Sequence, residues 1–271
     1  MPELGAVADT LFIPILGRIY ASEYCKSILT DEKALSIKDK LPKNQLERGR
    51  QTQYYLLASA ARSANMDRTI RDFLARKPDG VIVQLGCGLE TTFYRNDNGR
   101  TRWYEVDLPN VIAYRRTLLP EQKREIYLAG DAFDDGWFKR VRTDVPDAPL
   151  LVTASGLFHY FQEDQVLSLL RMLSQYGNIE VVFDAVSQKG LAMMQKKYMK
   201  EMGHGEAQMF FSVDRAARLA EQIGPHAIVL AEKPYYRNID KSGLKFFTKI
   251  SMIVSDHFHM VKMIHLKLER A

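Results

Sequence analysis

The stretch that decides the fold of this chain is Gln84-Leu85-Gly86-Cys87-Gly88-Leu89-Glu90, which closes the short apolar run Val81–Leu85. Two glycines one residue apart let a ligand approach the backbone closely, because neither carries a Cβ atom. In open α/β sheets, ligands bind in the crevice at the carboxyl ends of parallel strands. The stretch therefore predicts a ligand-binding loop after the first strand of such a sheet.

Working outward from this loop, short apolar runs alternate with amphipathic stretches. The runs are continuous, as expected for parallel strands covered by helices on both faces. We predict strands at 81–85, 102–106, 125–129, 149–154, 179–183, 227–231 and 261–268, and helices near 51–76, 109–119, 162–176 and 213–223. The pattern indicates an α/β fold with a doubly wound, Rossmann-like sheet of about seven strands.

Length and composition favour one domain. The chain has 271 residues, of which 46% are hydrophobic, so it can bury a sizeable core. We expect a single domain over 1–271, with a helical cover over 1–76, a core over 77–271 and a lid inserted around 190–211. Methionines interleaved with aromatic side chains suggest the lid, since they suit a flat apolar substrate, although an ordinary helix core would look similar.

Charge and cysteine content argue against several classes of protein. Lys and Arg outnumber Asp and Glu by 38 to 33, but the surplus is spread along the chain, which suits an anionic small molecule better than nucleic acid. The cysteines Cys25 and Cys87 show neither metal-ligand spacing nor a disulfide framework. No stretch is typical of a signal peptide or a membrane span. We expect a cytoplasmic protein without a metal site or a membrane partner.

An acidic residue lies at the spacing expected for nucleoside binding. Asp107 follows the glycines by about 20 residues, at the end of the second predicted strand, where a carboxylate can accept hydrogen bonds from both ribose hydroxyls. Thr91 stands where a dinucleotide fingerprint has its third glycine, so pyrophosphate binding is not indicated. S-adenosylmethionine, which has no phosphate, therefore fits this loop better than NAD.

A second acidic residue follows the third predicted strand. Asp131 can accept a hydrogen bond from an adenine amino group, with Ala132 or Phe133 as the apolar face. The alternatives are a helix N-cap for Asp131 and a turn residue for Asp107. The residues assigned to the cofactor pocket at this point are Gly86, Cys87, Gly88, Asp107, Leu108, Asp131 and Ala132.

These motifs resemble those of the leucine carboxyl methyltransferase family, in particular its bacterial branch of polyketide-type O-methyltransferases. The similar segments are Thr10–Pro14, Val83–Arg95, Asp97–Gly99, Trp103–Pro109 and Ala154–Phe161. The resemblance implies a class I methyltransferase fold with an antiparallel last strand. It also implies that S-adenosylmethionine is the cofactor.

The resemblance further implies roles for single residues. Arg62 falls at the family's arginine before the first strand and is expected to hold the cofactor's carboxylate, for which a guanidinium is a natural bidentate partner. A solvated helix arginine is the alternative. Two positions depart from the family: Glu90 stands where Asp is frequent, and Ser155 replaces the glutamate of Ala-Glu-Gly. The contacts of Ser155 and Gly156 with the cofactor, implied by the same motif, are therefore open.

The chemistry of methyl transfer suggests candidates for catalysis. The enzyme must align the acceptor oxygen with the methyl carbon and remove water, and no nucleophilic side chain is required. A carboxylate acceptor is already ionised at neutral pH, whereas a phenol benefits from a base. His159, whose ordinary pKa is about 6.5, is the candidate base, and Tyr160 can orient the acceptor. Simple packing is the alternative for both residues.

The sequence thus predicts an S-adenosylmethionine-dependent O-methyltransferase. Its expected partner is a small anionic or aromatic acceptor, methylated on a carboxylate or a phenolic hydroxyl of polyketide-like type. Methylation of a protein C-terminal carboxylate is one alternative. A regulatory protein that binds the cofactor without turnover is another, for which Ser155 is the hint.

Overall fold

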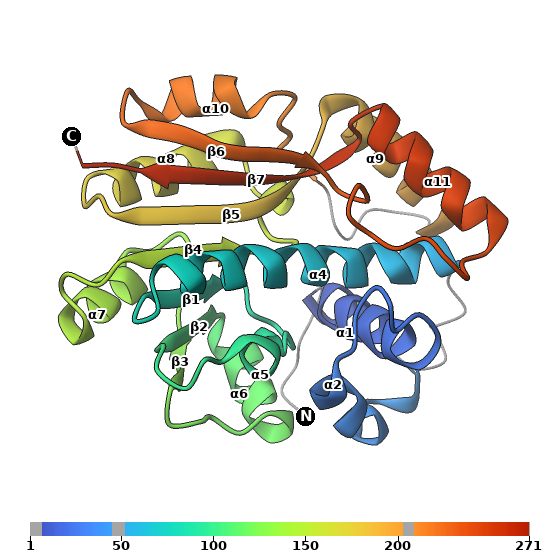
Figure 1. Ribbon diagram of the computed structural model, residues 1–271, viewed down its shortest axis with the longest axis horizontal. Helices are drawn as coiled ribbons and strands as arrows, with labels where there is room; N and C mark the ends of the chain where they lie inside the picture. The colour runs from blue at the N-terminus through green and yellow to red at the C-terminus, as the bar shows by residue number, and fades with distance from the viewer. Residues whose placement is uncertain (1–6, 45–51, 203–208, 271) are drawn as a thin grey trace.

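The computed structural model describes residues 7–44, 52–202 and 209–270, and these contain one seven-stranded sheet. The strand order is β3-β2-β1-β4-β5-β7-β6 (Figure 1). Strands β1 to β5 run parallel, and β7 runs antiparallel to both β5 and β6. The strands are β1 (Val81–Leu85), β2 (Trp103–Asp107), β3 (Glu125–Ala129), β4 (Leu150–Ala154), β5 (Ile179–Val186), β6 (Ala227–Pro234) and β7 (Val261–Leu268). The predicted doubly wound sheet with an antiparallel last strand is confirmed.

Helices connect and cover these strands. They are α1 (Val7–Tyr24), α2 (Glu32–Ser36), α4 (Gln53–Arg76), α5 (Thr92–Asn96), α6 (Pro109–Leu118), α7 (Gly136–Asp144), α8 (Glu163–Ser174), α9 (Gln188–Met202), α10 (Ala216–Ile223) and α11 (Phe246–His257), with 3-10 turns at Lys38–Lys40 and Phe158–Tyr160. Four of them, α4, α6, α8 and α10, lie where the sequence pattern predicts helices. The pattern did not predict α7 or α11. Helix α7 is short, with nine residues, and α11 carries apolar residues on its exposed side as well.

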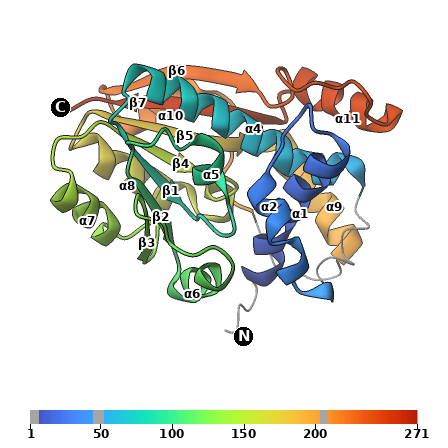
Figure 2. The same cartoon turned by 60° about the horizontal axis from the view of Figure 1, so that its bottom comes forward.

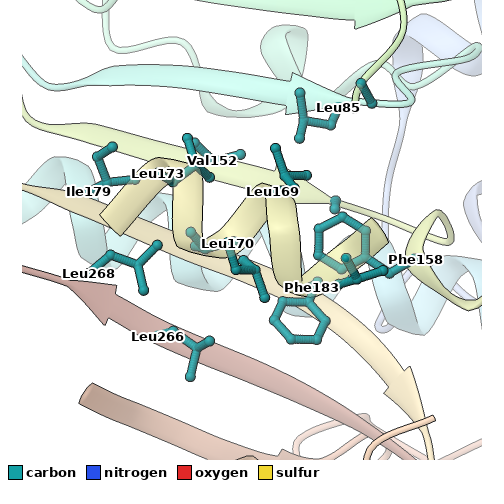
Figure 3. Packing of buried hydrophobic residues seen from close by; sticks show 14 of the residues in the cluster. Leu85, Val152, Phe158, Leu169, Leu170, Leu173, Ile179, Phe183, Leu266 and Leu268 are labelled. Carbon is teal, nitrogen blue, oxygen red and sulfur yellow. The ribbon is translucent and has the colours of Figure 1, made fainter. Parts of the chain in front are cut away.

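The two faces of the sheet are covered by different helices. On one face, Val152 of β4 and Phe183 of β5 pack against Leu170 and Leu173 of the amphipathic helix α8, and Leu266 of β7 joins them (Figure 3). On the other face the long helix α4 covers a second cluster that contains buried side chains of β1, β4 and β5. Helices α1, α9 and α11 gather at the end of the molecule toward which β6 points (Figures 1 and 2). This end is the carboxyl edge of the parallel strands.

A buried ion-pair network fixes the N-terminal helices to the loop after β1. Arg18 of α1 is fully buried, and its guanidinium donates to Asp31 Oδ2 at 3.0 Å, to Glu90 Oε1 at 2.5 Å and to the Leu89 carbonyl at 2.7 Å. A buried charge is costly unless it is paired and hydrogen-bonded. Glu90 therefore has a structural partner 72 positions away in the chain.

A second arginine extends the network to α4. Arg95 of α5 donates to Asp31 Oδ2 at 2.7 Å and to Asp67 Oδ2 at 2.8 Å. Burial on its own raises the pKa of the Asp31 carboxyl, but the guanidiniums of Arg95 and Arg18 more than reverse this effect, and the pKa lies below its ordinary value. Asp31 thus stays ionised and links α1 to α5.

Removing the central cation should destabilise the fold strongly. In an Arg18→Met variant, Asp31 and Glu90 lose a buried partner, and we expect the free energy of unfolding to fall by about 3–5 kcal/mol. Urea denaturation at pH 7 measures this loss. The control is Arg218→Met on the exposed side of α10, for which a change within about 0.5 kcal/mol is expected. Equal stability of the two variants would contradict the role given to the network.

Candidate active site

The loop after β1 needs glycine at both of its glycine positions. Gly86 and Gly88 have φ angles of 62° and 48°, in the left-handed region that other residues rarely adopt. A Cβ atom on Gly86 would lie 2.8 Å from Leu157 Cδ1, and one on Gly88 would lie 3.1 Å from Leu11 Cδ1. The loop is therefore packed closely between the N-terminal helix and the turn after β4.

Two buried arginines hold the carbonyl groups of this loop. Arg115 of α6 donates to the carbonyls of Gly88 at 3.0 Å and Glu90 at 2.6 Å, while Arg18 donates to the Leu89 carbonyl at 2.7 Å. Hydrogen bonds from charged donors are stronger than neutral ones. Three consecutive carbonyls are thus satisfied from inside the protein, which fixes the path of the loop.

Asp107, at the end of β2, holds the loop from the side of the carboxyl edge. Its Oδ2 accepts the Gly88 amide at 2.7 Å, and its Oδ1 accepts the Leu108 amide at 2.8 Å. Burial raises the pKa of the Asp107 carboxyl, and these two amides oppose the rise. Each carboxylate oxygen keeps lone pairs for further donors. Asp107 is only half-buried, so its carboxylate can accept further hydrogen bonds at this edge.

The other predicted cofactor residues near this edge differ in accessibility. Leu108 is 40% exposed, whereas Ala132 is buried in the core beside α7. The Cys87 side chain is fully buried against Ile112 and Tyr127, so only its backbone can meet a ligand. Burial also raises the pKa of the Cys87 thiol.

Asp131 is exposed and closes a turn. Its Oδ1 accepts the Phe133 amide at 2.9 Å, while α7 begins only at Gly136 with Asp135 as its N-cap residue. The alternative considered for Asp131, a helix N-cap, is therefore wrong, because the chain forms a turn before it enters the helix. One carboxylate oxygen of Asp131 is thus committed to the turn.

Arg62 of α4 lies beside the turn after β4. Its Nη1 is 3.4 Å from Asp184 Oδ2, and Asp184 Oδ1 accepts the Gly156 amide at 2.6 Å. A Cβ atom on Gly156 would lie only 2.5 Å from Arg62 Nη1. The Arg62 Nε is buried and has no hydrogen-bond partner among the described residues. Arg62 is therefore not a solvated helix arginine, and its spare donor fits an anionic group such as a carboxylate.

Sequence reasoning missed Asp184. The fifth strand was predicted to end at residue 183, but β5 continues to Val186 and carries Asp184 near its carboxyl end. An acidic residue at the carboxyl end of a predicted strand is part of the signal that identified Asp107, which also has the expected spacing from the glycines, and Asp131, which follows its strand after Gly130. The same signal was present after the run 179–183 and would have added Asp184 to the site.

The candidate catalytic residues lie in the 3-10 turn Phe158–Tyr160. His159 is 7% exposed, and its Nδ1 is buried without a hydrogen-bond partner in the described part of the chain. Burial lowers the pKa of His159, with Asp184 opposing and Arg62 reinforcing the shift, so the imidazole is neutral at pH 7. Its ring lies 4.7 Å from that of Tyr160, which packs beside Val186. A neutral imidazole can accept a proton.

Ser155 lines a small void that it shares with Glu90, Gln84 and Ser63. The Glu90 carboxylate already occupies this region, since Ser63 Oγ lies 3.5 Å from its Oε1. A glutamate at 155, as in the family's Ala-Glu-Gly, would bring a second carboxylate to the same place. The two departures from the family pattern therefore meet in one void.

The predicted lid around 190–211 falls partly outside the described residues, since 203–208 are not described. Of the flanking residues, Met193 and Phe210 are exposed, while Met209 and Phe211 are buried. The described residues include no group of three or more His, Cys, Asp or Glu side chains that could hold a metal ion. Nor does any helix among them have the length and apolar character needed to cross a membrane.

The strand order, the glycine loop and the acidic residues at the carboxyl edge define a class I S-adenosylmethionine-dependent methyltransferase. The sequence model of the leucine carboxyl methyltransferase family matches residues 14–174. The chain belongs to this family. The predicted enzyme class and cofactor are confirmed.

Two curated proteins are similar over about two thirds of the chain. The tetracenomycin polyketide synthesis O-methyltransferase TcmP of Streptomyces glaucescens is 29% identical over 186 residues, which cover 68% of this chain and 67% of TcmP. The S-adenosyl-L-methionine-dependent methyltransferase dpfgK of Gibberella zeae is 27% identical over 201 residues, 67% of each chain.

Solved structures support the fold. A DUF574 family protein of Streptomyces avermitilis superposes with a TM-score of 0.58 at 12% identity, covering 93% of this chain and 96% of that one. The magnesium protoporphyrin IX methyltransferase of Synechocystis, solved with bound S-adenosylhomocysteine, gives a TM-score of 0.51 at 9% identity, with coverages of 89% and 100%. At these identities the likeness concerns the fold alone.

Because Ser155 and Glu90 line the same void, we expect the charge of the side chain at position 155 to affect stability more than its size does. At pH 7 we expect Ser155→Glu to be less stable than the isosteric Ser155→Gln by about 1–3 kcal/mol, because it adds a carboxylate beside Glu90 in a buried place. The folded-state pKa of the new carboxyl is then raised above its unfolded value near 4.3, so the penalty exists above that pH and fades below it. Unfolding curves of both variants between pH 7 and pH 4 measure the difference. A constant gap over this range would contradict the repulsion.

Proposed function

We propose that this enzyme transfers the methyl group of S-adenosylmethionine to an oxygen atom of a small, polyketide-like acceptor, either a carboxylate or a phenolic hydroxyl. The similarity to TcmP, which by its name is a polyketide O-methyltransferase, supports this acceptor class. The geometry that carries the proposal is Arg62, whose buried Nε has no hydrogen-bond partner among the described residues, on the same carboxyl edge as Asp107. These two residues supply an anionic acceptor for the ribose hydroxyls and a cationic donor for the carboxylate of one cofactor.

In the proposed arrangement, each residue at the carboxyl edge contacts a different part of the cofactor. Asp107 accepts the ribose hydroxyls, Arg62 donates to the carboxylate, and Asp131 accepts from the adenine amino group through its remaining lone pairs. The cofactor supplies an electrophilic methyl group on a sulfonium. The residues proposed to line it with backbone or apolar atoms are Gly86, Cys87, Gly88, Leu108, Ala132, Ser155 and Gly156.

The chain's own contribution to the reaction is to orient the acceptor, exclude water and handle one proton. His159 is held neutral by burial and is proposed to take the proton of a phenol, while Tyr160 positions the acceptor. A carboxylate acceptor needs no proton removed at neutral pH. In that case alignment and desolvation carry the rate.

We further propose that the chain acts as one unit, because the buried network joins α1, α4 and α5 to the glycine loop. Both cysteines are buried and free. Free thiols suit a reducing compartment, which supports a cytoplasmic location.

Calorimetric titration tests the cofactor placement. We expect wild-type protein to bind S-adenosylmethionine and not NAD, and Arg62→Ala and Asp107→Ala to weaken binding at least about tenfold, or 1.4 kcal/mol. Gly156→Ala should do the same, because its Cβ displaces the Arg62 guanidinium. Gly99→Ala is its control: φ is +80° there too, but nothing lies within 4 Å of the added Cβ. Wild-type affinity in Gly156→Ala would place the cofactor's carboxylate away from Arg62.

An acceptor panel with labelled S-adenosylmethionine tests the reaction. We expect labelled esters or ethers from small aromatic carboxylates or phenols. With a phenol, kcat/KM should fall as the pH drops through the pKa of His159, which lies below 6.5, because the protonated imidazole cannot accept a proton. His159→Gln should remove this fall at low pH and lower kcat/KM about 10²-fold with phenols, and much less with carboxylates.

The control for this variant is His226→Gln, since His226 is exposed and lies outside the site. Transfer to a protein C-terminal carboxylate, but to no small molecule, would refute the proposed acceptor class. Tight cofactor binding without transfer to any acceptor would instead indicate a regulatory protein. An unchanged phenol profile in His159→Gln would exclude His159 as the base.

A further inference from the structure

A cavity of about 830 Å³ is lined by residues of the α1–α2 connection, helix α4 and helix α5. In Figure 1, α1, α2 and α5 all lie below α4, with α5 to the left of α1 and α2. The lining contains none of the residues assigned to the cofactor or the acceptor. Its volume falls within the range of about 300–1,000 Å³ that is typical of small-molecule sites.

The lining is strongly basic. Five basic residues face two acidic ones: Lys26, Lys33, Arg68, Arg71 and Arg95 against Glu32 and Asp67. Arg95 and Asp67 neutralise each other in the buried network. The remaining surplus of positive charge comes from two sides, the α1–α2 region and α4. A concave wall of one sign focuses the field and attracts ions of the other sign.

Two arginines on α4 carry the argument. Arg68 donates to Asn65 Oδ1 at 2.6 Å and to the Asn238 carbonyl at 3.0 Å, which are both neutral acceptors. Arg71, three positions on, donates from Nε to the Asp67 carbonyl at 3.2 Å and lies 3.6 Å from the Asp67 carboxylate, which already accepts from Arg95. Among the described residues, Arg68 therefore has no ion-pair partner. Two like charges one helical turn apart repel each other, and a bound anion would relieve the repulsion.

The other residues that line the cavity bear on the chemistry of the ligand. Lys33 Nζ lies 4.6 Å above the Tyr94 ring, and Ile28 and Leu29 provide an apolar floor. Guanidinium groups match the oxygens of phosphate in bidentate geometry. A doubly charged phosphate group uses this many cations better than a single carboxylate does.

We propose that this cavity is a second ligand site, which binds a small phosphate-bearing anion through Arg68, Arg71, Lys26 and Lys33. We expect this ligand and the methyl donor to bind at the same time, since the two sites share no residue. The inference does not depend on the identity of the methyl acceptor.

Calorimetric titration with inorganic pyrophosphate at low ionic strength tests the site. We expect saturable binding to the wild type, also at saturating S-adenosylmethionine. The double variant Arg68→Gln/Arg71→Gln should bind pyrophosphate at least about tenfold more weakly, equal to 1.4 kcal/mol. Its matched control is Arg215→Gln/Arg218→Gln, which removes two exposed arginines at the same spacing at the start of α10. The control should bind within about twofold of the wild type.

Unchanged S-adenosylmethionine binding by Arg68→Gln/Arg71→Gln would show that this variant is folded. The proposal is overturned if the wild type shows no saturable binding, or if both double variants lose affinity equally, since that would be a general charge effect. Displacement of pyrophosphate by S-adenosylmethionine would also overturn it, because the anion would then occupy the cofactor site. Binding to vesicles that contain phosphatidic acid, without binding to free pyrophosphate, would replace the small anion with a membrane surface.

Discussion

The site depends on the way in which two buried guanidiniums hold one loop. A loop with two left-handed glycines cannot place its carbonyls in a helix or a sheet, yet buried carbonyls must find donors. Arg18 and Arg115 supply these donors from opposite sides, and the carboxylates of Glu90 and Glu125 pair with them. The two buried guanidinium groups thus lie next to the loop carbonyls that require donors. The Gly88 amide donates to Asp107.

This arrangement makes the N-terminal helices part of the site. Helix α4 contributes Asp67 to the buried network and Arg62 to the pair with Asp184, so one rigid helix sets the position of the loop after β1 relative to the turn after β4. Gly156 is needed for the same reason, because a side chain there would push the Arg62 guanidinium away. The helices described within 7–44 and 52–76 therefore form a wall of the candidate site in addition to covering the sheet.

The sequence predicted the strands well, because a buried parallel strand leaves a continuous apolar run. The first and last strands, 81–85 and 261–268, have the predicted bounds, and Asp107 lies at the predicted edge. Glu90 could be recognised as a departure, but its reason could not, since its partner Arg18 lies in another helix and ion pairs between distant residues leave no periodic pattern. Helix α11 was missed because Phe246 and Phe247 are exposed, contrary to the usual pattern. Asp184 could have been predicted from the sequence, because it follows an apolar run in the same manner as Asp107.

The serine at 155 has a physical reading that does not require loss of activity. Relative to the family's motif, this chain has a longer acidic side chain at 90 and a shorter neutral one at 155, and both residues line the same void. The longer side chain reaches Arg18, which an aspartate in the same place would meet less well, and the shorter one leaves that carboxylate without a like-charged neighbour. The pair of changes thus keeps one carboxylate in the void instead of two. The lining of this void does not include Asp107, Arg62 or Asp184, the charged groups on which the proposed cofactor contacts depend.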